Sequence, residues 1–266
     1  MNCFLPIKKN LFLFIFIYLF AFAEQIAPSS ELYFYRLSWQ DEFTNMNSRW
    51  LKADWTFKES QSEFSDNYVV IKDGNMFIEV DKKEATKGNF MSKKYWGGEL
   101  YTLNDYMYGK YVVNMKPNCS PGVVASFFLF YVDFDSSLQP NDWAEIDIEF
   151  PGTTEYVQFN VRWMRKGDNK IHEAPKLFKL KFDASMDFHK YAIEWTPDYI
   201  AFYIDNHHIY TYKDADIIIE LKHKMSIRMN SWISNSISWA GQLDDRNLPN
   251  KSCWGYVKYF KMLQYN

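Results

Sequence analysis

Three carboxylic acids occur at alternate positions in the segment Trp143-Ala144-Glu145-Ile146-Asp147-Ile148-Glu149-Phe150. Successive side chains of a β-strand point to opposite faces, so an extended segment places Trp143 and the three acids on one face and the apolar side chains on the other. Like charges about 6.5–7 Å apart repel each other, and strands are depleted in Asp. The row is unfavourable for stability alone and therefore indicates a function; the alternative is a solvated strand that happens to be acidic.

The chemistry that fits this row is cleavage of a glycosidic bond. One carboxylate acts as nucleophile, one carboxylic acid protonates the leaving oxygen, and retaining enzymes hold the two carboxyls about 5–5.5 Å apart. The Cα atoms of Glu145 and Glu149 would be roughly 13 Å apart in a strand, and the two side chains can meet that spacing by leaning together. Asp147 would lie within reach of both, so we expect the acids to share a proton that keeps Glu149 protonated while Glu145 stays ionised.

The following segment predicts a second strand beside the acids. Pro151-Gly152-Thr153-Thr154 indicates a turn, and residues 156–163 return with their own alternation. Val157, Phe159 and Val161 would face the core, and Gln158, Asn160 and Arg162 would lie beside the acids. These polar groups would serve sugar hydroxyls; the alternative is a polar face exposed to solvent.

The elements that must position these residues are strands. Alternating runs between turn signals predict an antiparallel sandwich of two packed sheets, with strands over 76–81, 109–116, 123–132, 143–150, 156–163, 190–196, 199–205, 207–213, 225–232 and 255–262. Hairpin turns are expected at Thr196-Pro197-Asp198 and Asp205-Asn206-His207. We expect no helix beyond a single turn at residues 183–187.

Residues 1–23 have the features of a signal peptide, with Lys8 and Lys9 before an apolar run and small residues at Ala21 and Ala23. We therefore expect a secreted protein with no membrane segment after cleavage, since the apolar run is shorter than the roughly 20 residues that span a bilayer. No linker or repeat divides residues 24–266, which we expect to form a single domain.

The formal net charge is −3, with both signs interleaved along the chain, so nothing favours nucleic-acid binding. Aromatic residues make up 20% of the chain, which suggests that some rings line a binding surface and others pack between the sheets. Trp239, in a loop rich in Ser and Asn, fits either place.

Cys119 and Cys253 are the two cysteines outside the predicted signal peptide. In an exported chain they are a candidate disulfide, and two buried free thiols are the alternative. The five histidines show no metal-ligand spacing, and no motif indicates a Ser or Cys nucleophile or a phosphate-binding loop.

Residues 143–150 resemble the active-site strand of glycoside hydrolase family 16. From about residue 39 to 260 the chain is similar to the bacterial licheninases of that family, which are endo-β-1,3-1,4-glucanases with a β-jelly-roll fold. The other matching stretches are Tyr108-Gly109-Lys110-Tyr111, Val124-Ala125-Ser126-Phe127-Phe128, Val157-Gln158-Phe159-Asn160, Phe182-Asp183-Ala184-Ser185 and Met229-Asn230-Ser231-Trp232.

The resemblance implies an all-β jelly-roll sandwich of two antiparallel sheets with a concave substrate cleft. It implies Glu145 as nucleophile, Asp147 as assisting carboxylate and Glu149 as acid/base. It also implies substrate contacts from Glu99, Phe128, Trp143, Gln158, Asn160, Asn230 and Trp232.

The chain departs from the licheninases at several positions. Ala144 stands where they usually have an acid, Tyr101 where they have a cleft Arg, and Arg162 where they have a cleft Tyr. Their disulfide positions fall near Ala53 and Gly97, and an Asp that helps hold calcium aligns with Gly255. We predict no metal site.

The resulting hypothesis is an endo-acting, retaining β-glucanase, most similar to licheninases, that hydrolyses β-1,3-1,4-glucan as a monomer without a cofactor. One alternative is a transglycosylase that passes the same glycosyl-enzyme to xyloglucan or a cell-wall glucan. Another is a glucan-binding protein that has lost activity, although a binder gains little from three crowded acids.

Overall fold

The computed structural model describes residues 33–83, 93–137, 139–165 and 170–263. The predicted signal peptide lies outside the described residues. Within them, no helix is long and apolar enough to cross a membrane.

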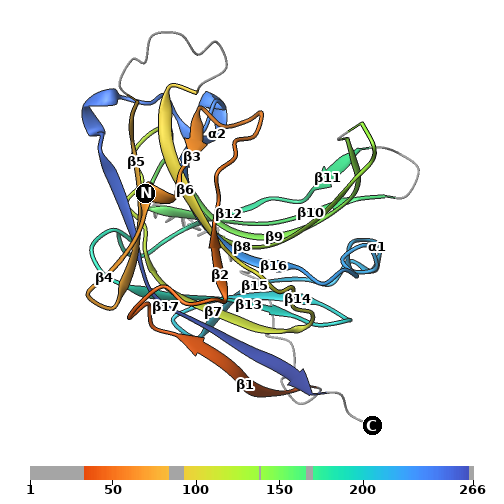
Figure 1. The fold of residues 1–266 in the computed structure, drawn as a ribbon. Helices are drawn as coiled ribbons and strands as arrows, with labels where there is room; N and C mark the ends of the chain where they lie inside the picture. The colour runs from red at the N-terminus through yellow and green to blue at the C-terminus, as the bar shows by residue number, and fades with distance from the viewer. Residues whose placement is uncertain (1–32, 84–92, 138, 166–169, 264–266) are drawn as a thin grey trace, which may run out of the picture.

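Two layers of strands make up the fold (Figure 1). Sheet A is built on β17, with β7, β13, β14 and β15 on one side of it and β1, β5 and β4 on the other. Its strands are β1 (Phe34–Asp41), β4 (Val69–Lys72), β5 (Asn75–Lys82), β7 (Gly109–Lys116), β13 (His189–Trp195), β14 (Ile200–Ile204), β15 (His207–Tyr212) and β17 (Asn250–Leu263).

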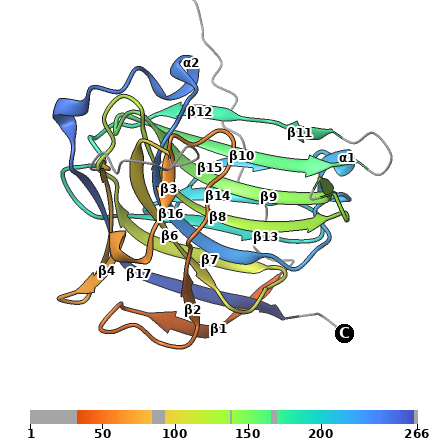
Figure 2. The ribbon, with the colours of Figure 1, turned by 45° about the horizontal axis from the view of Figure 1, so that its top comes forward.

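Sheet B has the order β2-β6-β16-β8-β9-β10, with β11 and β12 both beside β10, and Figure 2 shows these strands side by side. Its strands are β2 (Trp50–Lys52), β6 (Tyr95–Thr102), β8 (Val123–Phe134), β9 (Pro140–Pro151), β10 (Tyr156–Met164), β11 (Ile171–Glu173), β12 (Lys176–Lys179) and β16 (Ser226–Ile233). The short β3 (Ser62–Phe64) pairs with β6 in parallel, whereas the other pairings of the described strands are antiparallel.

The core lies between the two sheets. Alternate side chains of sheet B, such as Ile146, Ile148 and Phe159, are fully buried against alternate side chains of sheet A, such as Val113 and Tyr191. The opposite side chains of sheet B point away from sheet A, on the face that Figure 1 shows to be concave. The predicted fold class is therefore confirmed.

The structure contains every strand that the alternation predicted, with ends shifted by a few residues. Asp205 and Asn206 form the predicted hairpin turn with φ values of 48° and 66°, and residues 196–199 form the other. The two α-helices of the described chain, α1 (Ala215–Ile218) and α2 (Ile237–Ala240), have one turn each.

The candidate disulfide is not formed, because Cys119 and Cys253 are both free. Cys253 pairs across β17 with Phe77 and Lys116, whose side chains lie on the outer face of sheet A. Cys119 instead packs against the core between the sheets. The two thiols are free, as in the alternative, although only Cys253 is buried and Cys119 is half-buried.

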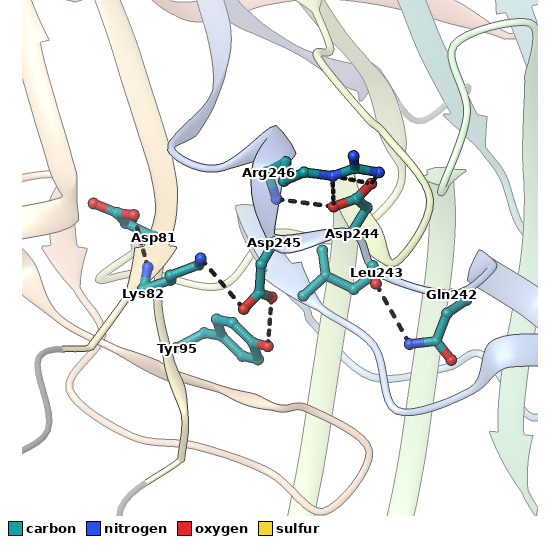
Figure 3. Close-up of polar contacts among 8 residues, drawn as sticks. All are labelled: Asp81, Lys82, Tyr95, Gln242, Leu243, Asp244, Asp245 and Arg246. Carbon is teal, nitrogen blue, oxygen red and sulfur yellow. Dashed lines mark hydrogen bonds and ion pairs between the residues drawn. The ribbon is translucent and has the colours of Figure 1, made fainter.

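The segment that leads from α2 to β17 is tied to β5 and β6 through Asp245 (Figure 3). Asp245 accepts a hydrogen bond from the hydroxyl of Tyr95 at 2.8 Å and lies 3.4 Å from Nζ of Lys82. The neighbouring Arg246 is largely exposed and pairs with Asp244. These contacts fix the loop that places α2 beside sheet B.

Candidate active site

The three acids lie on β9, which is an inner strand of sheet B. Residues 144–149 pair with β8 on one side and β10 on the other. The alternation places Ile146 and Ile148 in the core, so Glu145, Asp147 and Glu149 project from the opposite, concave face. The predicted faces of this strand are confirmed.

The predicted polar strand also has the expected register. Gln158 lies directly opposite Glu149, Asn160 opposite Asp147, and Arg162 opposite Glu145. Because directly opposite side chains share a face, each acid has a polar neighbour on β10.

The same cross-strand register aligns side chains in three rows across sheet B. One row contains Glu99, Asn230, Ser126, Glu149 and Gln158; the next contains Tyr101, Arg228, Phe128, Asp147 and Asn160; the third contains Ser226, Phe130, Glu145, Arg162 and Glu173. These rows contain every predicted site residue except Trp143 and Trp232. Trp143 precedes Glu145 by two positions and Trp232 follows Asn230 by two, so both share the face. The sheet thus brings all the predicted residues together, while their roles stay predictions.

Glu145 accepts two hydrogen bonds on a single oxygen. Trp143 donates from Nε1 to Oε2 at 2.9 Å, and Arg162 donates from Nη1 to the same Oε2 at 3.1 Å. The side chain of Glu145 is 12% exposed. Two charge-assisted donors hold this carboxylate in one orientation through Oε2.

The other two acids have raised pKa values. Burial raises the pKa of Asp147 well above its ordinary range, and the charges on Glu145 and Glu149 raise it further. Oδ2 of Asp147 is buried and has no hydrogen-bond partner among the described residues. Burial, followed by the charge of Glu145, raises the pKa of Glu149 to about 7. Asp147 and Glu149 therefore both release their protons at higher pH than free carboxylic acids do. That the three acids share one proton stays a prediction.

Gln158 connects Glu149 to α2. Its Nε2 donates to Oε2 of Glu149 at 2.9 Å, and its Oε1 accepts from Nε1 of Trp239 at 3.1 Å. Trp239 is half-buried and lies 6.0 Å from Trp232, measured between ring centroids. The residue that the sequence left between two interpretations therefore belongs to the site.

Glu99 lies at the other end of its row and is held by two donors. Arg228 donates from Nη1 to Oε1 at 2.7 Å, and Asn230 donates from Nδ2 to Oε2 at 3.0 Å. The guanidinium of Arg228 also lies over Tyr101 at 5.0 Å and Phe130 at 4.6 Å. Sequence reasoning missed Arg228, although it alternates with the predicted Asn230 and Trp232 along the same strand.

Arg162 contacts more acidic side chains than the sequence suggested. It was expected to offer hydrogen bonds to sugar hydroxyls, but it pairs with Glu145 and also lies 3.7 Å from Glu173, measured from Nε to Oε2. Burial lowers its pKa, but the carboxylates of Glu145, Asp147, Glu149 and Glu173 outweigh burial, and the net pKa is raised. The guanidinium is therefore always charged.

Within the described residues, no group of three or more His, Cys, Asp or Glu side chains is arranged to hold a metal ion. The chemistry available to this face is that of carboxylic acids, with arginine, amide and indole donors around them.

Comparison with known proteins gives one consistent result. The model of the family "Glycosyl hydrolases family 16" matches residues 52–251. A β-glucanase of Acetivibrio thermocellus is 36% identical over 229 residues, covering 82% of this chain and 61% of that protein. A β-glucanase of Brevibacillus brevis is 33% identical over 222 residues, covering 82% of this chain and 80% of that protein.

Solved structures agree with these sequence relatives. A prokaryotic β-1,3-1,4-glucanase (lichenase) from a mouse hindgut metagenome superposes with a TM-score of 0.70 at 30% identity, covering 83% of this chain and 97% of the other. The Bacillus licheniformis β-glucanase superposes with a TM-score of 0.68 at 29% identity, covering 83% and 96%. The chain spans about three fifths of the Acetivibrio relative's length.

Proposed function

This chain belongs to glycosyl hydrolases family 16, and from that premise we propose that it is an endo-acting, retaining β-glucanase that hydrolyses β-1,3-1,4-glucan. The observation that carries the proposal is the acid row on β9. It combines a carboxylate held by two donors at Glu145 with an acid at Glu149 whose pKa is raised to about 7. One fixed nucleophile and one acid that holds its proton near neutrality are what a retaining glycosidase requires.

In the first step, Oε1 of Glu145 attacks the anomeric carbon of the glucan. Glu149 donates its proton to the glycosidic oxygen, and the leaving chain departs as an alcohol. The product is a covalent glycosyl ester on Glu145, with inverted configuration at the anomeric carbon. Asp147 keeps its own proton beside the reacting pair and so adds no third charge.

In the second step, Glu149 has become a carboxylate and takes a proton from water. The water oxygen attacks the anomeric carbon, and the ester bond breaks to restore the Glu145 carboxylate. The second inversion gives net retention. Gln158 supports both roles of Glu149, because its amide holds the carboxyl in place whether or not it is protonated.

The preference for a mixed-linkage glucan is supported by the sequence relatives, which are β-glucanases, and by a structural neighbour named as a β-1,3-1,4-glucanase. The concave face offers rings at Phe128, Trp143 and Trp232 for the apolar faces of sugars, and Asn160 and Asn230 for their hydroxyls.

The test is a panel of barley glucan, lichenan, laminarin, xyloglucan and cellulose, with the anomer of the first product read by NMR. We expect rapid release of reducing ends from barley glucan and lichenan, and a β-anomer first. Preference for another glucan overturns the substrate, and an α-anomer overturns the mechanism. Glucan binding with no release of reducing ends would contradict the proposal that the protein is an enzyme.

The role of Glu145 has its own test in Glu145→Ala. We expect this variant to lose activity and to form an α-glycosyl azide when azide is added, because a small anion replaces the missing nucleophile. A β-glycosyl azide, or undiminished hydrolysis by the variant, would contradict the assignment.

We also propose that residues 1–23 direct export and that the mature enzyme acts outside the cell as a monomer, without membrane attachment. The support is the charged and apolar pattern of that segment. Expression of the full chain with N-terminal sequencing of protein from the medium tests export, and gel filtration tests the monomer. Retention of an uncleaved chain in the membrane fraction would contradict it.

A further inference from the structure

Arg162 lies between two carboxylates on neighbouring strands. Glu145 is directly opposite it on β9, and Glu173 is directly opposite it on β11. Its Nη1 lies 3.1 Å from Oε2 of Glu145, and its Nε lies 3.7 Å from Oε2 of Glu173. The guanidinium carbon also lies 5.5 Å from the ring centroid of Trp143. The position of the charge is therefore set from three sides.

The interaction of Arg162 with Glu145 changes during the proposed reaction. In the free enzyme Glu145 is an anion and attracts the guanidinium. In the glycosyl-enzyme it is a neutral ester, so most of the attraction is lost. The attraction returns while the ester bond breaks, because negative charge then develops on the Glu145 oxygens. A fixed cation that meets a developing charge lowers the barrier of the step that creates it.

We propose that Arg162 is a positioning residue that accelerates breakdown of the glycosyl-enzyme by stabilising Glu145 as a leaving carboxylate. The inference rests on the proposed function and adds to it the step at which this guanidinium acts. The contact of Arg162 with Glu173 does not depend on the charge of Glu145, so it remains while Glu145 is esterified.

The chemical balance of this step is complete within the site. The bond between the anomeric carbon and the Glu145 oxygen breaks, and its electron pair stays on Glu145. The water oxygen forms the new bond to the anomeric carbon, and the water proton moves to the Glu149 carboxylate. Arg162 gains and loses no proton, in keeping with its raised pKa.

The experiment uses Arg162→Gln, Arg162→Lys and the wild type with a dinitrophenyl β-glycoside of a mixed-linkage gluco-oligosaccharide. Dinitrophenolate leaves without help from an acid, so the first step is fast and kcat reports breakdown of the ester. Rapid-quench measurement of dinitrophenolate, with intact mass of the quenched protein, follows the two steps separately. Arg246→Gln is the matched control, because Arg246 is 88% exposed and pairs with Asp244 away from the acid row.

For Arg162→Gln we expect kcat to fall about tenfold or more, because a charge-assisted hydrogen bond is lost in the second step. We expect kcat/KM, which reports the first step, to fall much less. A burst of dinitrophenolate and a protein mass raised by one glycosyl unit should accompany this change. Arg162→Lys should recover part of kcat, and Arg246→Gln should match the wild type.

Equal losses of kcat and kcat/KM without a burst or an ester in Arg162→Gln would overturn the inference while leaving the hydrolase intact. Near-UV circular dichroism shows whether each variant folds. If Arg162→Lys folds and Arg162→Gln does not, equal losses of kcat and kcat/KM without a burst or an ester in Arg162→Lys would overturn the inference. Absence of dinitrophenolate release and of a glycosyl adduct in the wild type would instead overturn the proposed function.

Discussion

At the scale of single residues, the site gives two glutamates on one strand different surroundings. Glu145 faces two donors, whereas Glu149 lies among carboxyls with one amide donor from Gln158. These surroundings, and not the residue type, are the basis on which we propose one glutamate as nucleophile and the other as acid.

The raised pKa of Glu149 predicts the alkaline limit of activity. Because Glu149 must carry a proton in the first step, kcat/KM on glucan should decline above an apparent pKa near the value of about 7 given by its surroundings. A pH profile of kcat/KM checks this. Glu149→Gln should lose glucan hydrolysis but keep the first step with a dinitrophenyl glycoside. If kcat/KM for that first step still declines at alkaline pH as in the wild type, the assignment of Glu149 as the acid is contradicted.

The same pKa predicts how stability depends on pH. The folded pKa of Glu149 lies above its ordinary value of 4.5, so the folded state holds the proton more tightly. Its contribution to the free energy of unfolding is therefore fully present below about pH 4.5 and is lost as the pH rises toward about 7. Allowing for partial exposure, Glu149→Gln should become more stable relative to the wild type by about 2 kcal/mol over this range.

Urea unfolding of both proteins at about pH 5 and about pH 8 measures this difference. A constant gap between the two proteins would show that Glu149 titrates alike in the folded and unfolded states.

Gln158 provides a third prediction for the acid. Its amide lowers the pKa of Glu149 against the larger effect of burial. Gln158→Leu should therefore move the alkaline limb of kcat/KM to higher pH and reduce its maximum about tenfold, the cost of one charge-assisted hydrogen bond. Trp239→Phe, which removes the indole donor to Gln158 but keeps an aromatic ring, is the milder companion. A shift to lower pH in Gln158→Leu would refute the argument.

At the scale of elements, strands whose apolar and polar residues alternate in the sequence were predictable, whereas β6 was not. Alternation found β9 and β10 together with the facing of each side chain. It did not find β6, where Gly97, Gly98, Glu99 and Leu100 are all buried. A Cβ on Gly98 would lie 2.8 Å from Val69 of β4 and 2.9 Å from Ile78 of β5. Close packing of these strands therefore requires glycine at a position where alternation would otherwise show a side chain.

The site was predictable to a similar extent. The acids and their β10 neighbours followed from alternation, and Glu99 followed from the family resemblance. Arg228 and Trp239 did not, because their functions depend on contacts between distant segments. Arg228 meets Glu99 across β16 and β6, and Trp239 reaches Gln158 from α2.

Gly152, in the turn after β9, and Gly74, between β4 and β5, make a matched pair of glycine variants. Gly152 and Gly74 have φ values of 70° and 71°, so alanine is strained at either position, by about 1–2 kcal/mol. A Cβ on Gly152 would also lie 1.8 Å from the carbonyl oxygen of Ala240, whereas the nearest such atom to Gly74 is 3.9 Å away. Gly152→Ala should therefore destabilise the protein more than Gly74→Ala in urea unfolding.

Gly152→Ala should also reduce kcat/KM, because the clash displaces α2 and with it the indole of Trp239. Equal stability of the two glycine variants, or full activity of Gly152→Ala, would contradict this link between turn and site.

At the scale of the whole molecule, two packed sheets stabilise the fold without a disulfide in the described residues. Burial raises the pKa of the Cys253 thiol to about 11 and also raises that of Cys119. For protein lacking residues 1–23, we expect both thiols to react slowly with a disulfide reagent in the native state and fully after unfolding without reductant. A mass lower by two hydrogens than that of the free dithiol would show a bridge instead.

The limits of residues 24–266 as one domain stay a prediction, as does cleavage near residue 24. Limited proteolysis of the exported protein addresses both.

The inner position of β9 determines how readily this strand opens compared with the outer strands. Amide hydrogens of residues 144–149 are bonded within a strand that has partners on both sides, so their exchange with deuterated solvent should require the largest opening of the molecule. The short outer strands β2 and β11 should exchange sooner. On gentle heating, the outer strands of the groove would open while the carboxylates on β9 keep their spacing. Affinity for long glucans should therefore decline before turnover of short activated glycosides does.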